Sequence, residues 1–333
     1  MSRLAGHRVG DPVRIDRVVV VRKTSAIERQ RSAPDARVAR VLSAGGPVAA
    51  RLEATHLEHV RTCDAVEAAL HAAGCRVRVV HGLRRRDVIG ADLIVTIGGD
   101  GTFLRASHCV ETGPDGRSVP MLGINSAPHS SVGFFCAATA DDFAATLDAL
   151  AAGGRCSRPL WRMRVHINGQ RVTDAALNDV LVAHRVPAET TRYTLEVDAE
   201  SQRQKSSGIW VATSAGSTGA IRSAGGDVLP LDDRRVQFRV RELFPLSVGK
   251  QVPLVGGVSE RLRLISHTVS GMLYLDGAHR RAPFGMGDVL EFGCDPEPLP
   301  WVAPLEAESR REAVRAESEV VLRKAGFLGQ LER

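Results

Sequence analysis

The sequence predicts an α/β domain with a parallel sheet, followed by an antiparallel β-sandwich. Two observations carry this prediction. In the first half, strand-like apolar runs alternate with helix-like segments, whereas in the second half short apolar runs follow one another between Gly, Pro, Asn or Asp residues. Alternating strands and helices are typical of parallel sheets covered by helices. Short strands at close spacing are typical of sandwiches.

Each predicted strand of the first half is a short apolar run. The run VVVVR at 18–22 predicts a buried strand. Residues 49–73 have helical periodicity and stop at Gly74, which suits the end of a helix. Further strands are predicted at 76–80, 93–97 and 121–125, and further helices at 103–110 and 139–152. This order predicts a Rossmann-like parallel α/β domain at the N-terminus.

Eight short strands are predicted in the second half, with the domain boundary near Gly153. They are residues 161–167, 175–183, 193–197, 209–213, 236–241, 261–265, 272–275 and 289–292. The last residues are rich in Glu, Arg and Ala, which predicts a charged, solvent-exposed helix, with contact to a partner chain as the alternative. The predicted division is a flexible N-terminus at 1–14, an α/β domain at 15–153, a β-sandwich at 154–303 and a charged C-terminal helix at 304–333.

Composition excludes several classes of protein. A chain of 333 residues that is 44% hydrophobic is not mostly disordered. The six cysteines lie far apart without a CxxC pair, which argues against a zinc module or a disulfide scaffold. The net charge of +6 suits a cleft for phosphorylated small molecules, and an aromatic content of 4% gives little support for stacking on nucleic-acid bases. No apolar run reaches the ~18 residues of a membrane span. We therefore expect a soluble, cytoplasmic protein without nucleic-acid or membrane partners.

The strongest local signal is the pentapeptide GGDGT at 98–102, which links a predicted strand to a predicted helix. Gly98, Gly99 and Gly101 allow the backbone to approach a polyphosphate closely. The start of the helix adds N–H groups and the positive end of a dipole. Asp100 suits a general base on a hydroxyl group or a contact to Mg²⁺. The alternative is a tight turn in which Asp100 only caps the helix.

Three further groups of residues suit ligand binding. Asn125 ends a predicted strand, where ligands usually lie in α/β sheets, although it could instead hold its own turn. Asn178 and Asp179 interrupt an apolar strand, so they are either paired within the fold or face a cleft. A carboxylate beside an amide suits a ribose diol or an adenine edge. Residues 206–226 run from an apolar strand into a predicted short helix starting at Gly216, whose hydroxyl groups could hold phosphates, with a flexible loop as the alternative.

These blocks together resemble the NAD kinase family. The matching blocks are GGDGT at 98–102, GxN at 123–125, the Asn-Asp pair at 178–179 and GST…SAGG at 216–226. The resemblance spans about residues 15–300. It implies an α/β domain with a β-sandwich domain, homodimers or homotetramers, and transfer of the ATP γ-phosphoryl group, with Mg²⁺, to the adenosine 2′-hydroxyl of NAD(H).

The same resemblance implies roles for individual residues. Asp100 would be the catalytic base, and no residue is assigned to a metal. The implied binding residues are Gly98, Gly99, Gly101, Thr102, Asn125, Asn178, Asp179, Lys205, Ser207, Thr218, Gly219, Ala220 and Ser223.

Four positions depart from the usual family pattern. Together with the segments NSAPHSSVGFFCAAT at 125–139 and RVREL…SVG at 239–249, they resemble the plant-type NADH kinase branch. Ser207 stands for an aspartate, Asp179 for a glutamate, Ala220 for a tyrosine and Ala278 for a glutamine. The oxidised nicotinamide ring is cationic and the reduced ring is neutral. Loss of a nearby carboxylate removes an attraction for the cation of up to ~4 kcal/mol at an effective dielectric constant of ~20. If residue 207 faces the nicotinamide, NADH becomes the candidate preferred acceptor.

Two other functions stay open at this stage. Lipid kinases of the diacylglycerol or sphingosine type share GGDGT and a β-sandwich partner domain, but their usual GTxNDfA-type block is absent here. A non-catalytic, dinucleotide-binding sensor would explain the missing tyrosine and acid, although the intact Asp100 argues against it.

Overall fold

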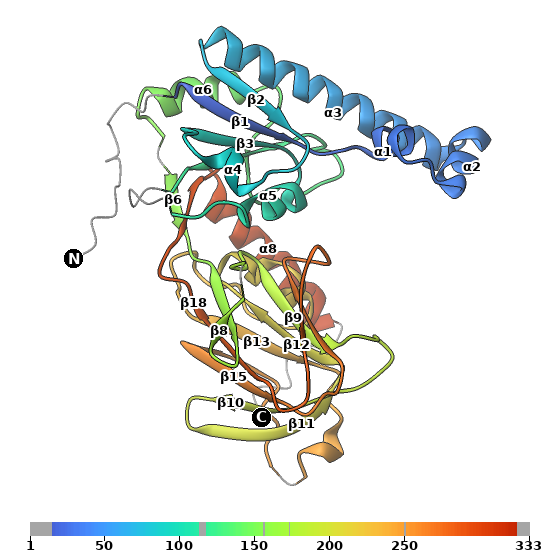
Figure 1. Ribbon diagram of the computed structural model, residues 1–333, viewed down its shortest axis with the longest axis vertical. Coiled ribbons are helices and arrows are strands. Elements are labelled where there is room, and N and C mark those ends of the chain that lie inside the picture. Colours follow the sequence, from blue (N-terminus) through green and yellow to red (C-terminus); the bar gives the residue numbers. More distant parts are fainter. Residues whose placement is uncertain (1–14, 113–117, 156, 173, 250, 325–333) are drawn as a thin grey trace. The chain divides into compact units, whose positions relative to one another are not determined.

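The computed structural model describes residues 15–112, 118–155, 157–172, 174–249 and 251–324. Within this part, the chain forms two compact units (Figure 1). The first comprises the chain up to Arg158 together with Leu299–Ala307, and the second comprises Pro159–Pro298 and the chain from Glu308 onward. Residues 1–14, which the sequence predicts to be flexible, lie outside the described residues.

The first unit is built on one sheet with the strand order β2-β1-β3-β4-β19-β6, and β5 also pairs with β4. Strands β1 to β4 pair in parallel, as predicted. The strands are β1 (Arg17–Arg22), β2 (Arg76–Val80), β3 (Leu93–Gly98), β4 (Met121–Asn125), β5 (Cys136–Ala138), β6 (Ser157–Leu160) and β19 (Leu299–Val302). All six residues of β3 are buried, because helices cover both faces of a parallel sheet.

The long helix α3 covers one face of this sheet (Figure 1). Its Val66 and Leu70 pack with Val18 and Val20 of β1. The helices of the unit are α1 (Ala26–Ser32), α2 (Ala36–Ala44), α3 (Pro47–Ala72), α4 (Arg85–Val88), α5 (Asp100–Ser107) and α6 (Phe143–Ala151). Helices α1 and α2 are not among the elements predicted from the sequence, although a capping box of Ser25 and Glu28 marks the start of α1.

The second unit is a sandwich of two antiparallel sheets, as predicted. Their strand orders are β11-β10-β15-β18-β7-β8 and β14-β13-β12-β9-β16-β17. Apolar side chains from both sheets form one core. The strands of the first sheet are β7 (Met163–Ile167), β8 (Gln170–Arg171), β10 (Thr191–Val197), β11 (Glu200–Ser206), β15 (Arg261–Ser266) and β18 (Val289–Cys294). Those of the second are β9 (Asp179–His184), β12 (Gly208–Ala212), β13 (Val236–Arg241), β14 (Gly256–Ser259), β16 (Gly271–Leu275) and β17 (Arg280–Phe284).

Several predicted segments differ from the structure. Helix α6 begins at Phe143 instead of 139, and β9 begins at Asp179 instead of 175, so Asn178 and Asp179 lie at the start of this strand and do not interrupt it. Strands β6 and β19 belong to the parallel sheet, so the assignment of all of 154–303 to the sandwich is corrected at both ends. Helix α5 begins at Asp100, three residues before the predicted start, because Gly99 already occupies the N-cap position. The short helix predicted from Gly216 is two pieces, the 3₁₀ turn η1 (Ala215–Thr218) and α7 (Ala220–Ser223), with Gly219 between them.

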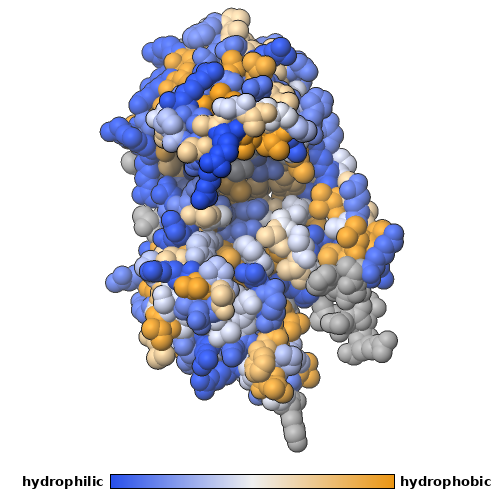
Figure 2. All heavy atoms as spheres, turned by 90° about the vertical axis from the view of Figure 1, so that its right-hand side faces the viewer, coloured by the Kyte–Doolittle hydropathy of each residue, from blue (hydrophilic) through white to orange (hydrophobic). Residues whose placement is uncertain are grey.

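The C-terminal helix α8 (Ala307–Lys324) exists as predicted and is strongly charged. On the face drawn in Figure 2, apolar residues form small groups among hydrophilic ones. Among the described residues, no helix combines the length and the hydropathy needed to span a membrane.

Strand β19 makes a testable contribution to stability through Trp301, which is fully buried and donates its indole N–H to the carbonyl of Phe135 at 3.0 Å. Trp301→Phe keeps an aromatic ring but leaves this buried carbonyl without its donor. We expect the free energy of unfolding to fall by about 1–3 kcal/mol, measured by urea denaturation. Leu305→Ala, at a residue that is 78% exposed, is the control and should stay within about 0.5 kcal/mol of wild type. Equal stability of both variants would contradict the role of this hydrogen bond.

Candidate active site

The glycine turn lies at the carboxyl edge of the parallel sheet. Gly98 ends β3, Gly99 caps α5, and Asp100, Gly101 and Thr102 form the first turn of that helix. A Cβ atom on Gly98 would lie 2.2 Å from the Thr102 Oγ1 atom, so this position requires glycine. The ends of the neighbouring strands meet the turn here, since the amide of Ser126 donates to the Gly98 carbonyl at 2.9 Å. This edge is where open α/β sheets bind ligands.

The Asp100 carboxylate is bound by backbone amides instead of capping its own helix. Its Oδ2 atom accepts the N–H of Phe134 at 3.0 Å, and its Oδ1 atom accepts the N–H of Phe135 at 2.8 Å. Each carboxylate oxygen can accept more than one hydrogen bond. Asp100 is therefore held in one orientation while it remains able to accept a hydrogen bond from a ligand hydroxyl.

Asn125 ends β4, and its side chain bonds its own loop. Its Nδ2 atom donates to the carbonyl of Ser131 at 3.0 Å, and its Oδ1 atom accepts the N–H of Ala127 at 3.1 Å. Gly133 lies against this amide with a φ of +61°, and a Cβ atom there would be 2.5 Å from the Asn125 Nδ2 atom. Asn125 therefore shapes the loop beside Asp100. This agrees with the alternative interpretation, in which Asn125 holds its own turn.

A buried histidine that the sequence analysis missed ties two strand ends to helix α3. The His59 Nε2 atom lies 2.8 Å from the Lys23 carbonyl, and its Nδ1 atom lies 3.0 Å from the Ser126 hydroxyl. Burial lowers the pKa of His59, so the ring is neutral. Because a carbonyl only accepts, Nε2 carries the proton and Nδ1 accepts from Ser126. No motif marks this residue, since a lone histidine on a helix has many ordinary explanations.

In the second unit, Asn178 and Asp179 lie against residues 214–219, which contain η1 and are called the small-residue turn below. A Cβ atom on Gly216 would be 1.9 Å from the Asn178 carbonyl oxygen, and one on Gly219 would be 3.1 Å from the Asn178 Nδ2 atom. The amide of Thr213 donates to the Asn178 carbonyl at 3.0 Å. Two sequence motifs about 40 residues apart therefore form one surface, because η1 packs directly on the start of β9.

Asp179 belongs to a pair of carboxylates. The neighbouring Asp276 accepts the N–H groups of Leu177, Asn178 and Asp179 at 2.7 to 3.0 Å. Asp179 itself receives a hydrogen bond of 3.4 Å from the Asn178 side chain. Burial raises the pKa of Asp179 to about 7, and the nearby Asp276 carboxylate acts in the same direction. Asp179 is therefore a carboxyl group that titrates near neutral pH.

Ser207 lies at the other end of β12 from the residue that pairs with Asp179, and Lys205 lies in β11 of the other sheet. Asp179 pairs with Ala212 at the end of β12, whereas Ser207 precedes the first residue of that strand and donates its N–H to the Arg241 carbonyl. At ~3.3 Å per residue, the two positions are roughly 17 Å apart along the strand. The Lys205 ammonium lies 5.0 Å from the ring centre of Phe244. The structure therefore does not bring these two residues to Asn178 and Asp179 within this unit.

The remaining binding residues implied by the resemblance lie in η1 and α7. Thr218 ends η1, Gly219 joins the two pieces, and Ala220 and Ser223 begin and end α7. They follow directly on the segment that packs against Asn178.

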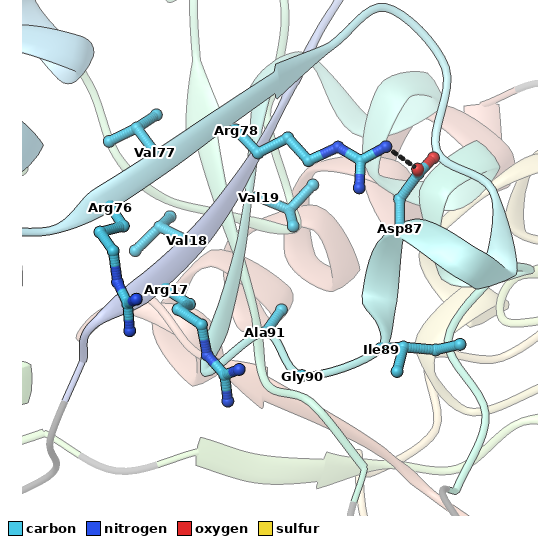
Figure 3. A pocket seen from close by; sticks show the side chains of 10 residues that line it. All are labelled: Arg17, Val18, Val19, Arg76, Val77, Arg78, Asp87, Ile89, Gly90 and Ala91. Carbon is cyan, nitrogen blue, oxygen red and sulfur yellow. Dashed lines mark hydrogen bonds and ion pairs between the residues drawn. The ribbon is translucent and has the colours of Figure 1, made fainter.

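A cavity of about 230 Å³ in the first unit lies elsewhere (Figure 3). It is lined by Arg17 and Arg76, the first residues of β1 and β2. Figure 3 shows Arg78 directed toward Asp87. The Arg78 Nη2 atom lies 2.6 Å from the Asp87 Oδ1 atom. The amino ends of the strands lie at the edge opposite to the glycine turn. This cavity is therefore not part of the candidate site.

The raised pKa of Asp179 predicts a pH dependence of stability. The ordinary value is 3.8 and the folded value is about 7. The stabilising contribution of the protonated group is therefore complete below about pH 4 and is lost as the pH rises through about 7. Since one pKa unit corresponds to about 1.4 kcal/mol, urea unfolding at pH 5 to 8 should show wild type losing a few kcal/mol relative to Asp179→Asn. The exposed Asp232→Asn is the control, and a wild-type slope equal to that of Asp179→Asn would contradict the assignment.

Comparisons of the sequence agree with the motifs. The family described as the ATP-NAD kinase N-terminal domain matches residues 19–155. A probable NADH kinase of Oryza sativa subsp. japonica is 35% identical over 238 residues, which are 64% of this chain and 71% of that protein. The NADH kinase of Arabidopsis thaliana is 33% identical over 235 residues, which are 63% of this chain and 71% of that protein. The NAD kinase of Methanothermobacter thermautotrophicus is 30% identical over 203 residues, or 60% and 68% of the two chains.

Solved structures share the fold. The crystal structure of an NAD kinase from Archaeoglobus fulgidus in complex with ATP aligns with a TM-score of 0.64 and 22% identity, covering 90% of this chain and 98% of that one. The structure of yeast NADH kinase complexed with NADH aligns with a TM-score of 0.66 and 15% identity, covering 97% and 90%. With the sequence relatives and the glycine turn of β3, these likenesses lead to one conclusion: the chain belongs to the NAD kinase family.

Proposed function

We propose that this protein is an NAD(H) kinase that transfers the γ-phosphoryl group of ATP to the adenosine 2′-hydroxyl of NAD(H), with NADH as the preferred acceptor. The observation that carries the proposal is the oriented Asp100 carboxylate beside the glycine turn, at the carboxyl edge of a parallel sheet. The named relatives from rice and Arabidopsis are both NADH kinases, which supports the preference. None of the relatives and structures named above is a lipid kinase.

Phosphoryl transfer depends mainly on positioning and charge stabilisation. In the proposed mechanism, Asp100 accepts the proton of the attacking hydroxyl while the amides of Phe134 and Phe135 keep its oxygens in place. The amides at the start of α5 and the glycine turn bind phosphate oxygens. Asp100 thus holds the proton of the hydroxyl at a defined place. The backbone amides align the γ-phosphoryl group of ATP with that hydroxyl.

Mg²⁺ fits this site as part of Mg-ATP. Among the described residues, no group of three or more His, Cys, Asp or Glu side chains could hold a metal. Mg²⁺ is commonly held by one or two carboxylates together with substrate phosphates, and Asp100 is the carboxylate at the turn. The ion would neutralise charge on the transferred group.

The acceptor would be held by the second unit. Asn178 and Asp179 suit hydrogen bonds to ribose hydroxyls or an adenine edge, with residues 218–223 beside them. Ser207 precedes the far end of β12, and Lys205 lies in β11 of the other sheet. Their separation from Asp179 supports a homodimer or homotetramer in which they serve a neighbouring subunit's site. The described cysteines are free thiols, which supports a reducing compartment such as the cytoplasm.

The test of this function is turnover by the purified protein with Mg-ATP, offering NAD and NADH in separate reactions. Formation of NADP or NADPH would support the kinase, and a higher rate with NADH would support the preference. Binding of a dinucleotide without any product would instead favour the non-catalytic sensor. If neither turnover nor binding is detected, lipid acceptors are the next substrates to offer.

Asp100→Asn should abolish most turnover. The amide side chain is nearly isosteric but cannot take the hydroxyl proton, and general-base catalysis typically contributes 10²–10⁴-fold. We expect kcat to fall at least about 100-fold. The same change at the exposed Asp148 of helix α6 is the matched control and should leave kcat unchanged. A fully active Asp100→Asn enzyme would show that Asp100 is not the base.

Ser207→Asp should shift the preference toward the oxidised dinucleotide. A carboxylate near the cationic nicotinamide adds an attraction that the neutral reduced ring lacks, and about one third of the ~4 kcal/mol estimate corresponds to tenfold. The readout is the ratio of kcat/KM for NADH to that for NAD, which we expect to fall about tenfold. Ser201→Asp adds the same charge at an exposed position of β11 and should not change the ratio. An unchanged ratio in Ser207→Asp would contradict the proposed position of Ser207.

A further inference from the structure

The C-terminal helix α8 inserts one deeply buried charged side chain into the second unit. Arg311 is 3% exposed, whereas Glu312 and Arg315 on the same helix are exposed. The sequence predicts a solvent-exposed charged helix, and this prediction is wrong at Arg311. A guanidinium group is buried at a high desolvation cost unless its N–H groups find acceptors.

The acceptors of Arg311 lie in and around the small-residue turn. Its Nη2 atom donates to the Ser214 carbonyl at 2.8 Å, to the Ser217 hydroxyl at 2.9 Å and to the Leu229 carbonyl. The Ser217 hydroxyl also donates to the Ser214 carbonyl at 2.7 Å and accepts the Leu229 N–H at 2.9 Å. Arg311 and Ser217 therefore fix η1 to the chain segment that follows the SAGG block.

A second arginine, Arg222, extends from α7 to α8 and so connects the same two parts from the opposite side. Arg222 of α7 is buried, and its Nε atom donates to the Ser318 hydroxyl of α8 at 2.6 Å. Its Nη2 atom donates to the Arg315 carbonyl at 3.3 Å, and its Nη1 atom donates to the Gly226 carbonyl at 2.7 Å. Two arginines, one from each side, thus join α8 to the segment 214–226. Such a double connection fixes both the position and the direction of the segment.

The segment that α8 holds is the one that packs on Asn178. Gly216 approaches the Asn178 carbonyl so closely that no Cβ atom would fit, and Gly219 lies against the Asn178 amide. Residues 214–219 therefore have the start of β9 as one neighbour, while Ser214 and Ser217 bind Arg311. A shift in η1 would change the spacing between Thr218 and Asn178.

Burial lowers the pKa of Arg311 to about 10, and Glu308, one turn earlier on α8, acts in the opposite direction. The side chain is therefore protonated at neutral pH and offers its full set of donors. A neutral side chain of similar length would leave two carbonyls and a hydroxyl without this donor.

We propose that Arg311 is a positioning residue for acceptor binding: from α8 it holds η1 against Asn178, so that α8 is a working part of the dinucleotide site. This inference rests on the proposed assignment of residues 178–179 and 218–223 to the dinucleotide. Arg311 does not need to touch the ligand. We expect the loss of Arg311 to weaken binding of the dinucleotide and not of ATP. The turn that Arg311 holds belongs to the second unit, whereas the glycine turn of β3 belongs to the first.

The experiment compares Arg311→Met, Arg311→Lys and Ser217→Ala with wild type in the full chain. NADH binding is measured by calorimetry, the KM values for NADH and ATP by steady-state kinetics, and the melting temperature by calorimetry. A misplacement of about 1 Å can lower the rate of an enzymatic reaction by about 100-fold. We expect Arg311→Met to weaken NADH binding and raise its KM by about tenfold, with the KM for ATP within about twofold. Arg311→Lys, which keeps a charge and fewer donors, should recover part of the loss.

Ser217→Ala removes the hydroxyl that Arg311 and Leu229 share, so it tests the same connection if Arg311→Met does not fold. It should weaken NADH binding in the same selective way. The matched control is Arg315→Met, at an exposed residue of the same helix, which should leave all three measurements unchanged.

A lower melting temperature with unchanged NADH binding in Arg311→Met and in Ser217→Ala would overturn the proposal, because the contact would then be merely structural. Equal losses for NADH and ATP would also overturn it. The proposed function fails separately: a wild-type protein that binds NADH without turning it over is not a kinase, yet its variants still test Arg311 through binding. If wild type does not bind NADH at all, both proposals are wrong.

Discussion

The orientation of Asp100 by two backbone amides is the constraint on which the glycine-turn region of the first unit depends. The amides belong to Phe134 and Phe135, so their direction depends on how these residues are packed. The Phe135 ring stacks on the ring of Phe103 in α5, with their centres 5.1 Å apart, and the Phe135 carbonyl accepts the Trp301 indole N–H. Helix α5 therefore supplies both the Asp100 carboxylate and, through Phe103, one of the two contacts that position the donating amides. The other contact comes from Trp301 of β19, nearly 200 residues later in the sequence.

Most of the fold follows from the pattern of apolar residues, and the sandwich strands that this pattern does not predict have a common physical cause. The predicted strands of the sandwich are its inner strands, where one side of the strand faces the core. The four sandwich strands that the pattern does not predict, β8, β11, β14 and β17, are the edge strands of the two sheets. Edge strands in proteins are short or polar, which limits further pairing, and β11 with its sequence ESQRQKS is an example. No strand is predicted at LPWV, and its residues fall within the range 154–303 predicted as sandwich, whereas β19 joins the parallel sheet.

The motif-bearing parts of the site were found from sequence because they need unusual residues at short spacing. GGDGT and the Asn178–Asp179 pair are of this kind, since close backbone approach and buried polar groups leave few substitutes. Residues that act through distant partners were not found. His59 bonds to Lys23 and Ser126, and Arg311 bonds to Ser214 and Ser217, from helices whose local sequence is ordinary. Their roles depend on tertiary contacts that no spacing along the chain encodes.

Asp100 and Asp179 illustrate how surroundings divide the work between two carboxyl groups. Asp100 receives two amide N–H groups, which aim its oxygens. For Asp179, the nearby amides bond to Asp276 instead, and burial with this neighbour raises its pKa to about 7. A ribose hydroxyl that donates to Asp179 would bind its ionised form, so binding would draw off the proton. Burial thus disfavours the ionised form of Asp179 in the free protein. The carboxylate oxygens are left to accept a hydrogen bond that the ligand donates.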